Sequence, residues 1–141
     1  MRKSIAKNIG YPLQDFIRRT SIIKTLEFLR ETQYWDKDRI DNYRLGKLKK
    51  LIEYSSRNVP YYGTLFSKIK LKSSDLKSLS DIYKIPILTK EIARIESNNL
   101  ISKNFNRKNV KHGKTGGTTG TPLVLMKDTM NRSVTWASYY R

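Results

Sequence analysis

One stretch of the chain combines residue types that suit binding of an anion. Residues 114–123 read KTGGTTGTPL. Glycine tolerates positive φ and lets a backbone approach a ligand closely, and threonine hydroxyls and free backbone N–H groups donate to anionic oxygens. Lys114 adds a positive charge at the mouth of the stretch. The pattern indicates a loop that wraps phosphate oxygens, and the alternative is a glycine-rich hairpin turn with no ligand.

Two familiar phosphate-binding patterns do not describe this stretch. The GKT of residues 113–115 resembles the end of a Walker A motif, but that motif needs a glycine five positions earlier, where Lys108 stands. The dinucleotide fingerprint G-x-G-x-x-G fails because Gly116 and Gly117 are adjacent. Any phosphate site here therefore belongs to another class.

The loop must be positioned by the elements on either side of it. The sequence predicts a strand around Val110 and a second strand in PLVLMK, residues 122–127. A helix is predicted over residues 128–141, with Asp128 or Thr129 as its cap. His112 is interpreted as a strand or loop residue with no catalytic task.

Two amphipathic helices are predicted in the first part of the chain, over residues 12–34 and 38–57. The first predicted apolar face consists of Phe16, Ile22, Ile23, Leu26 and Leu29, and the second of Leu45, Leu48, Leu51 and Ile52.

The second helix should end at Val59, because a residue before proline is pushed to extended geometry. Short turns and helices are predicted after it, followed by a polar loop over residues 97–109. The predicted helix caps are Ser74 or Asp75, Ser80 or Asp81, and Thr89, the last for a helix through about Glu96.

Composition narrows the class of protein. With 141 residues, 38% of them hydrophobic, the chain is long enough for one domain of mixed α/β class. No apolar run approaches the length of a membrane span, no signal peptide is recognised, and there is no cysteine. The expected location is the cytoplasm. The net charge of +17 indicates either a polyanionic partner, such as nucleic acid or an anionic membrane, or simply a solvated basic surface.

The run TGGTTGTP closely resembles the phosphate-binding loop of adenylate-forming enzymes, which include the acyl-CoA synthetases and luciferases. Their pattern is T-[SG]-G-[ST]-T-G-x-P, between two strands. Leu123 and Val124 replace the lysine and glycine that often follow, as in the branch of phenylacetate–CoA ligase and proteins of capsular polysaccharide biosynthesis. LIEYSSRNVPYYGTLF (residues 51–66) and LSDIYKIPILTKEIAR (residues 79–94) also resemble that branch, so the likeness covers the chain from about residue 40.

The resemblance implies a reaction in two halves. A carboxylate attacks the α-phosphate of ATP carried with Mg²⁺, which gives an acyl-adenylate and pyrophosphate, and a thiol, usually of coenzyme A, then takes the acyl group. No catalytic or metal-binding residue is assigned in this chain. The residues that would bind the nucleotide are Thr115, Gly116, Gly117, Thr118, Thr119, Gly120 and Thr121.

The magnesium-binding acid, the ribose-binding aspartate and the catalytic lysine of the family all lie after this loop. Residues 1–141 are therefore interpreted as the N-terminal portion of an AMP-binding domain, with a helical region over about 1–100 and a phosphate-loop unit over about 108–141. Alone, this fragment is expected to be inactive. The alternative is a small basic nucleic-acid-binding protein whose nine tyrosines stack on bases. Tyr61, Tyr62, Tyr139, Tyr140, Trp35 and Trp136 are instead predicted to be packing residues.

Overall fold

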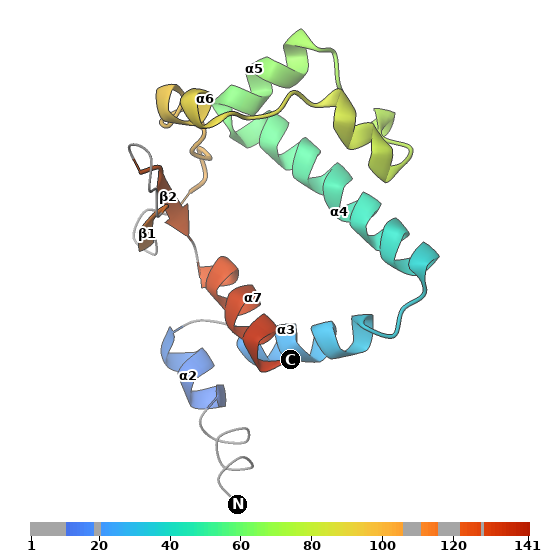
Figure 1. Ribbon diagram of the computed structural model, residues 1–141, viewed down its shortest axis with the longest axis vertical. Helices are drawn as coiled ribbons and strands as arrows, with labels where there is room; N and C mark the ends of the chain where they lie inside the picture. Colours follow the sequence, from blue (N-terminus) through green and yellow to red (C-terminus); the bar gives the residue numbers. More distant parts are fainter. Residues whose placement is uncertain (1–10, 19–20, 106–110, 116–121, 128) are drawn as a thin grey trace, which may run out of the picture. The chain divides into compact units, whose positions relative to one another are not determined.

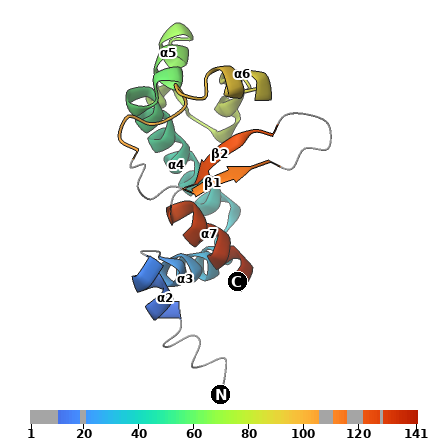
Figure 2. The ribbon, with the colours of Figure 1, turned by 90° about the vertical axis from the view of Figure 1, so that its left-hand side faces the viewer.

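A computed structural model of the chain describes residues 11–18, 21–105, 111–115, 122–127 and 129–141. The chain forms two compact units (Figures 1 and 2). The discontinuous unit consists of residues 1–35 and 107–141, and the continuous unit of residues 36–106. The described part is mixed, mainly helical with one small antiparallel sheet, as the sequence predicts. None of its helices combines the length and the apolar character that crossing a bilayer requires.

The discontinuous unit is built on a pair of helices from opposite ends of the chain. Helix α3 (Ile22–Thr32) packs against α7 (Thr129–Tyr140), and both views show the two helices in contact (Figures 1 and 2). Ala137 is fully buried between Ile22 and Leu26. The backbone N–H of Ser21 donates to the buried hydroxyl of Ser133 over 3.1 Å.

The single helix predicted over residues 12–34 is instead two helices, α2 (Tyr11–Arg18) and α3. Asp15 of α2 explains the change of direction, because its two carboxylate oxygens accept the N–H groups of Ile22 and Ile23 over 3.0 and 3.1 Å. These donors at a helix start have no partner inside the helix. Phe16, predicted to be on the apolar face, is 83% exposed, so that part of the prediction was wrong.

The discontinuous unit also contains a β-hairpin, which directly precedes α7 in the sequence. Strand β1 (Lys111–Lys114) pairs with β2 (Val124–Lys127) in antiparallel register, with Lys114 opposite Val124 and Lys111 opposite Lys127. The predicted strand–loop–strand unit is therefore confirmed, although Val110 lies outside the described residues. The predicted helix after it is confirmed as α7, and its proposed cap Asp128 also lies outside them.

The continuous unit begins with its longest helix, α4 (Lys37–Asn58), close to the predicted 38–57. The Asp36 carboxylate caps α4 by accepting the Arg39 N–H over 2.7 Å. Val59 is extended and ends α4, as predicted, and Pro60 then starts helix α5 (Pro60–Lys68), which the sequence analysis did not assign. At the crossing of these helices a Cβ on Gly63 would lie 2.9 Å from the Ser56 carbonyl oxygen, so only glycine fits there without a shift.

The core of the continuous unit joins α4, α5 and the turn that follows them. Ile52, Phe66 and Leu76 are buried together. Tyr62 stacks on Phe66 with ring centroids 5.4 Å apart, and its burial, together with the nearby Tyr61, raises the pKa of its hydroxyl. The other side chains packed against this core include Leu45, Leu48, Leu65, Ile69, Leu71 and Ile85.

Not every predicted core position is buried. Leu51, assigned to the apolar face of α4, is 60% exposed, so that assignment was wrong. Trp136 is 41% exposed and Tyr139 is 78% exposed, so the prediction that these two side chains pack in the interior was wrong. Trp136 instead stacks on Tyr140, with ring centroids 6.0 Å apart on the surface of α7.

Three short helices complete the continuous unit: η2 (Ser73–Asp75), η3 (Leu79–Lys84) and α6 (Lys90–Ile95). The Asp75 carboxylate accepts the Lys72 N–H over 2.8 Å, and Thr89 caps α6 as predicted by accepting the Ile92 N–H. The N-caps of η2 and η3 are Lys72 and Ser78. The sequence analysis predicted Ser74 or Asp75 and Ser80 or Asp81 for these positions, so both predictions were wrong.

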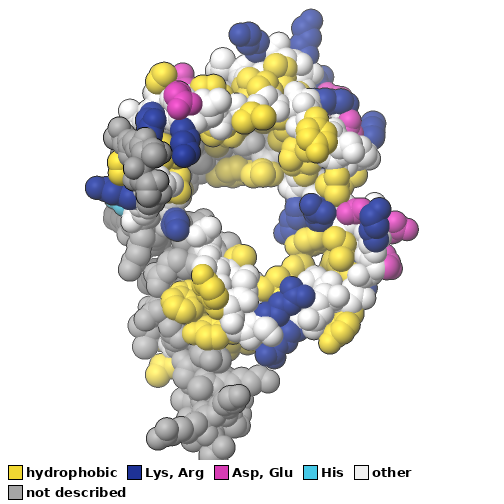
Figure 3. All heavy atoms as spheres, viewed as in Figure 1, with side chains coloured by type: hydrophobic (Ala, Val, Ile, Leu, Met, Phe, Trp, Pro, Cys, Tyr) yellow, Lys and Arg dark blue, Asp and Glu magenta, His cyan; other side chains and the backbone are white. Residues whose placement is uncertain are grey.

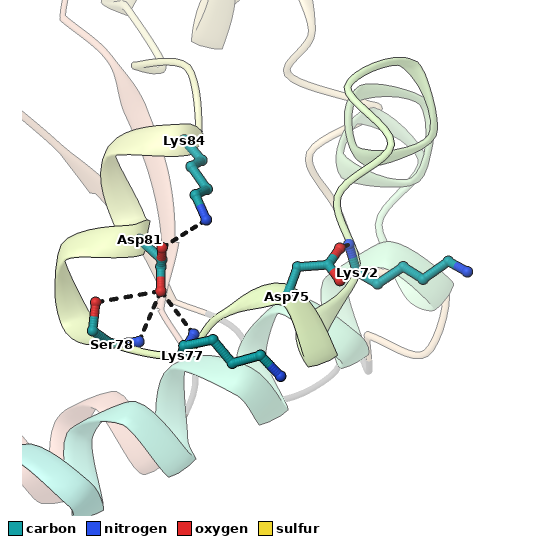
Figure 4. A network of polar contacts seen from close by, with 6 residues as sticks. All are labelled: Lys72, Asp75, Lys77, Ser78, Asp81 and Lys84. Carbon is teal, nitrogen blue, oxygen red and sulfur yellow. Dashed lines mark hydrogen bonds and ion pairs between the residues drawn. The ribbon is translucent and has the colours of Figure 1, made fainter.

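Asp81, in the third position of η3, holds the start of that helix (Figure 4). Its carboxylate accepts the N–H groups of Lys77 and Ser78, each over 2.7 Å, and pairs with the Lys84 ammonium at 2.7 Å. The Lys84 contact and these two N–H groups hold the pKa of Asp81 well below its ordinary value. The carboxylate therefore stabilises the turn in its charged form.

The segment after α6 returns to the junction of α4 and α5. The Tyr61 N–H donates to the Asn99 carbonyl over 3.0 Å, and the Lys103 N–H donates to the Asn58 carbonyl over 2.8 Å. The Asn104 side chain also donates to the Asn58 side chain over 2.7 Å. Residues 97–105 have no regular structure, as predicted, and are attached by these hydrogen bonds.

Candidate functional site

The candidate site is the glycine- and threonine-rich loop of the β1–β2 hairpin. Of the seven residues predicted to bind nucleotide, the structure describes Thr115. The other six, Gly116, Gly117, Thr118, Thr119, Gly120 and Thr121, lie outside the described residues. Thr115 and Pro122 are the described residues at the two ends of the loop, and we call this region the base of the loop.

Thr115 and Leu123 close the base of the loop. The Thr115 N–H donates to the Leu123 carbonyl over 3.0 Å. The Leu123 N–H donates back to the Thr115 hydroxyl oxygen over 3.0 Å. The Thr115–Leu123 pair continues the pairing of the two strands by one residue beyond Lys114 and Val124, so the two ends of the loop are held next to each other.

The role of the Thr115 hydroxyl is therefore more specific than the sequence indicates. A hydroxyl has one proton to donate and two acceptor sites. The hydrogen bond from Leu123 uses an acceptor site, and the proton remains available for an anionic ligand. Thr115 is thus suited both to closing the loop and to binding at its base.

Basic side chains gather on the hairpin. Lys114 and His112 are exposed and lie on one face, since alternate residues of a strand share a face. On the other face the Lys127 side chain lies over Gly113, where a Cβ would be 3.5 Å from the Lys127 Cε and 3.9 Å from its Nζ. Because Gly113 has no side chain, the Lys127 side chain can lie against the backbone there.

The described hairpin residues, 111–115 and 122–127, include three lysines and no acidic residue. Two of these lysines, Lys111 and Lys127, are directly opposite one another in the register. The positive charges of Lys114 and Lys127 favour an anion at the hairpin.

Sequence reasoning missed Lys127 and Leu123 as parts of the site. The sequence indicated only that both residues belong to the predicted second strand. It did not indicate the register that sets Lys127 over Gly113, because that register depends on the length and closure of the loop. Once Thr115 and Leu123 are known to pair, the other residues of β1 and β2 can be assigned to the two faces of the hairpin, because successive side chains of a strand point to opposite faces.

The described residues contain no group of three or more His, Asp or Glu side chains arranged to hold a metal ion. At the hairpin, Thr115 and Lys114 can donate hydrogen bonds and positive charge to an anion.

Comparison with known proteins adds no assignment, because neither a protein-family model nor a curated protein sequence matches this chain.

Proposed function

We propose that this chain is the phosphate-binding, N-terminal portion of an AMP-forming ligase of the phenylacetate–CoA ligase type. The ligase would activate a carboxylic acid with ATP to an acyl-adenylate and transfer the acyl group to a thiol, that of coenzyme A. The proposal rests on the resemblance of residues 115–122 to the loop of such enzymes.

One structural observation supports this proposal above all others. The TGGTTGTP run lies between two paired strands whose ends are joined by the reciprocal Thr115–Leu123 hydrogen bonds. Fixing the two ends of a loop removes part of the chain entropy that would otherwise be lost when a ligand orders it. A loop of this kind suits stabilisation of the charge that develops as pyrophosphate leaves.

The donors near the loop fit the triphosphate of ATP rather than its metal. Thr115 and Lys114 would bind phosphate oxygens, together with the loop residues predicted from sequence. The Mg²⁺ would arrive on the triphosphate and neutralise part of its charge. Lys127, on the opposite face from Lys114, adds to the positive potential around the hairpin.

The proposal is tested by Gly117→Val in the enzyme that contains this chain. A β-branched side chain resists positive φ and crowds the phosphates, so carboxylate-dependent exchange of pyrophosphate into ATP should be abolished. Thr118→Ala or Thr119→Ala removes one donor of several and should lower the rate about ten- to a hundredfold, from roughly 1.5–3 kcal/mol. Full exchange activity in the Gly117→Val enzyme would contradict the assignment of the loop.

Thr115 allows a matched pair of variants. Thr115→Ser keeps the hydroxyl that accepts from Leu123 and should retain exchange activity. Thr115→Val keeps the shape but removes both that acceptor and the hydroxyl proton available to a phosphate oxygen, so activity should fall about tenfold or more. Equal activity in the two variants would show that closure of the loop base is unimportant.

Nucleic-acid binding, the alternative function, predicts the reverse order. Neutralising Lys47, Lys49 and Lys68 should then weaken binding of DNA or RNA and reduce its dependence on salt. Gly117→Val should in that case affect folding alone. Under the ligase proposal the same lysine variants leave pyrophosphate exchange nearly unchanged.

A further inference from the structure

The segment around the end of η3 exposes apolar side chains in an unusual density. Tyr83 is 88% exposed, Ile87 is 85% exposed and Ile82 is 47% exposed. Single exposed apolar residues are common on protein surfaces, whereas a contiguous group of them marks an interaction site.

These side chains are exposed on an ordered segment. Between them, Ile85 packs against the core formed by Ile52, Phe66 and Leu76, and its N–H donates to the Ile82 carbonyl over 3.0 Å. The start of η3 is held by Asp81, as Figure 4 shows. The exposed apolar group is therefore carried by a segment that is attached on both sides of Tyr83.

The surrounding sequence is basic. Residues 68–94 contain seven Lys and Arg against three Asp and Glu. Two of the acids, Asp75 and Asp81, accept backbone N–H groups, and Asp81 is also paired with Lys84. Figure 3 shows dark blue basic and yellow apolar side chains side by side on this unit. Among the described residues, five exposed or half-exposed lysines of the segment form no ion pair: Lys68, Lys70, Lys72, Lys77 and Lys90.

We infer that the segment that carries Ile82, Tyr83 and Ile87, together with the lysines of residues 68–90, binds an anionic lipid bilayer. The apolar side chains would enter the boundary between headgroups and acyl chains, and the lysines would contact the negative headgroups. Tyrosine suits this boundary because its ring is apolar and its hydroxyl stays wet. The inference is independent of the ligase proposal.

The exposed isoleucines decide between a bilayer and a nucleic acid. Isoleucine neither stacks on a base nor donates to a phosphate, whereas its transfer from water to an apolar phase is favourable. Nucleic acid would use the lysines and Tyr83 and would leave Ile82 and Ile87 in water. A bilayer uses all three apolar side chains and the charge together.

The test is co-sedimentation of the full chain with vesicles of phosphatidylcholine, with and without phosphatidylserine. Binding is expected only to the vesicles that contain phosphatidylserine and should weaken as salt is added, because the Debye length is about 10 Å at 0.1 M. Equal binding to the neutral vesicles, or no binding to either, would overturn the inference.

Matched variants assign the surface. Tyr83→Ser and Ile87→Ser should each weaken binding about tenfold, and Lys72→Gln or Lys77→Gln about fivefold. Tyr34→Ser is the control for Tyr83, because Tyr34 is 84% exposed in the other unit, and Leu51→Ser is the control for Ile87 on helix α4. All these side chains are exposed, so circular dichroism should show unchanged folding.

A spectroscopic probe gives a second readout. Tyr83→Trp should show a blue shift of tryptophan emission on adding phosphatidylserine vesicles, beyond the shift of Tyr34→Trp, which shares the native Trp35 and Trp136. The inference fails if the two probes respond alike, or if the serine variants bind vesicles as the unchanged chain does. It also fails if the chain binds DNA or RNA in place of vesicles.

Discussion

In the continuous unit, side chains that pack together come from neighbouring elements, as where Phe66 of α5 covers Ile52 of α4. In the discontinuous unit, the core joins α3 to α7 through Ile22, Leu26 and Ala137. Its hydrogen bond from Ser21 to Ser133 connects residues 112 positions apart. One unit therefore assembles from local contacts and the other from contacts between the two ends of the chain.

This difference bears directly on the candidate site. The hairpin belongs to the discontinuous unit and leads into α7, so the helix that follows the loop is held by residues 22–32. The first helices of the chain, which carry little recognisable motif, thus support the element next to the loop. A change far from the loop in sequence can alter the discontinuous unit without touching the continuous one.

The largest expected effect comes from separating the pieces. Residues 36–106 expressed alone should keep their helical circular dichroism, because their core is internal. Residues 107–141 alone should lose α7, because an isolated helix shorter than about 12–15 residues is marginal in water. Adding residues 1–35 should restore part of the helical signal. A fully helical α7 in the isolated 107–141 peptide would show that α3 is not needed.

Phe66→Ala should be the most damaging single substitution in the continuous unit. Phe66 is 2% exposed and stacks on Tyr62 against Leu76, so its loss leaves a cavity. The expected loss of unfolding free energy is about 3–5 kcal/mol, measured by denaturant titration. The matched control is Phe16→Ala, since Phe16 is 83% exposed and should cost little. Hydrogen exchange of α7 should be unchanged if the two units are independent.

Lys70→Gly should stabilise the continuous unit by about 1 kcal/mol. Lys70 has φ of 54°, in the left-handed region that glycine adopts without steric cost, just after α5. The N–H of Leu71 donates to the Phe66 carbonyl and that of Lys70 to the Ser67 carbonyl, the usual pattern of a glycine-ended helix. Lys72→Gly is the control, because Lys72 is extended at φ −114° and should be destabilised by glycine. A loss of stability in Lys70→Gly would contradict this account.

The smallest expected effect is a pH dependence at Asp81. Because the folded-state pKa of Asp81 is lowered, its contribution is fully present above the ordinary value of 3.8. That contribution is lost as the pH falls from there through the lowered folded-state pKa. Asp81→Asn should therefore be less stable than the unchanged chain near neutral pH, and the difference should shrink below about pH 4. Urea titrations of both proteins over this range measure it, and a constant difference would exclude Asp81 as the cause.

Features that depend on neighbouring residues could be predicted from the sequence. Helix α4 was predicted within one residue at each end because its apolar spacing is long and regular and Pro60 follows it. Thr89 was identified as a cap because its hydroxyl lies three residues before the N–H that it accepts. The β1–loop–β2 order also followed from the sequence, because glycines interrupt two runs suited to strands.

Features that depend on distant residues could not be predicted. Nothing near Asp15 indicates that its carboxylate caps α3, because that depends on how α2 lies against the start of α3. Leu51 and Ile52 are adjacent apolar residues of one helix, yet one is exposed and the other buried, because the position of α5 decides which is covered.

The sequence by itself determined helix α4, the order of strand, loop and strand before α7, the charge of the chain and the glycine–threonine composition of the loop, since these depend on local conformational preference and residue chemistry. Tertiary structure alone decided that α3 pairs with α7, that Lys127 lies over Gly113, and that Thr115 closes the loop with Leu123. The physical reason is that such contacts join residues whose separation carries no local signal. They form only when burial of apolar surface and pairing of backbone groups outweigh the entropy lost in closing the chain between them.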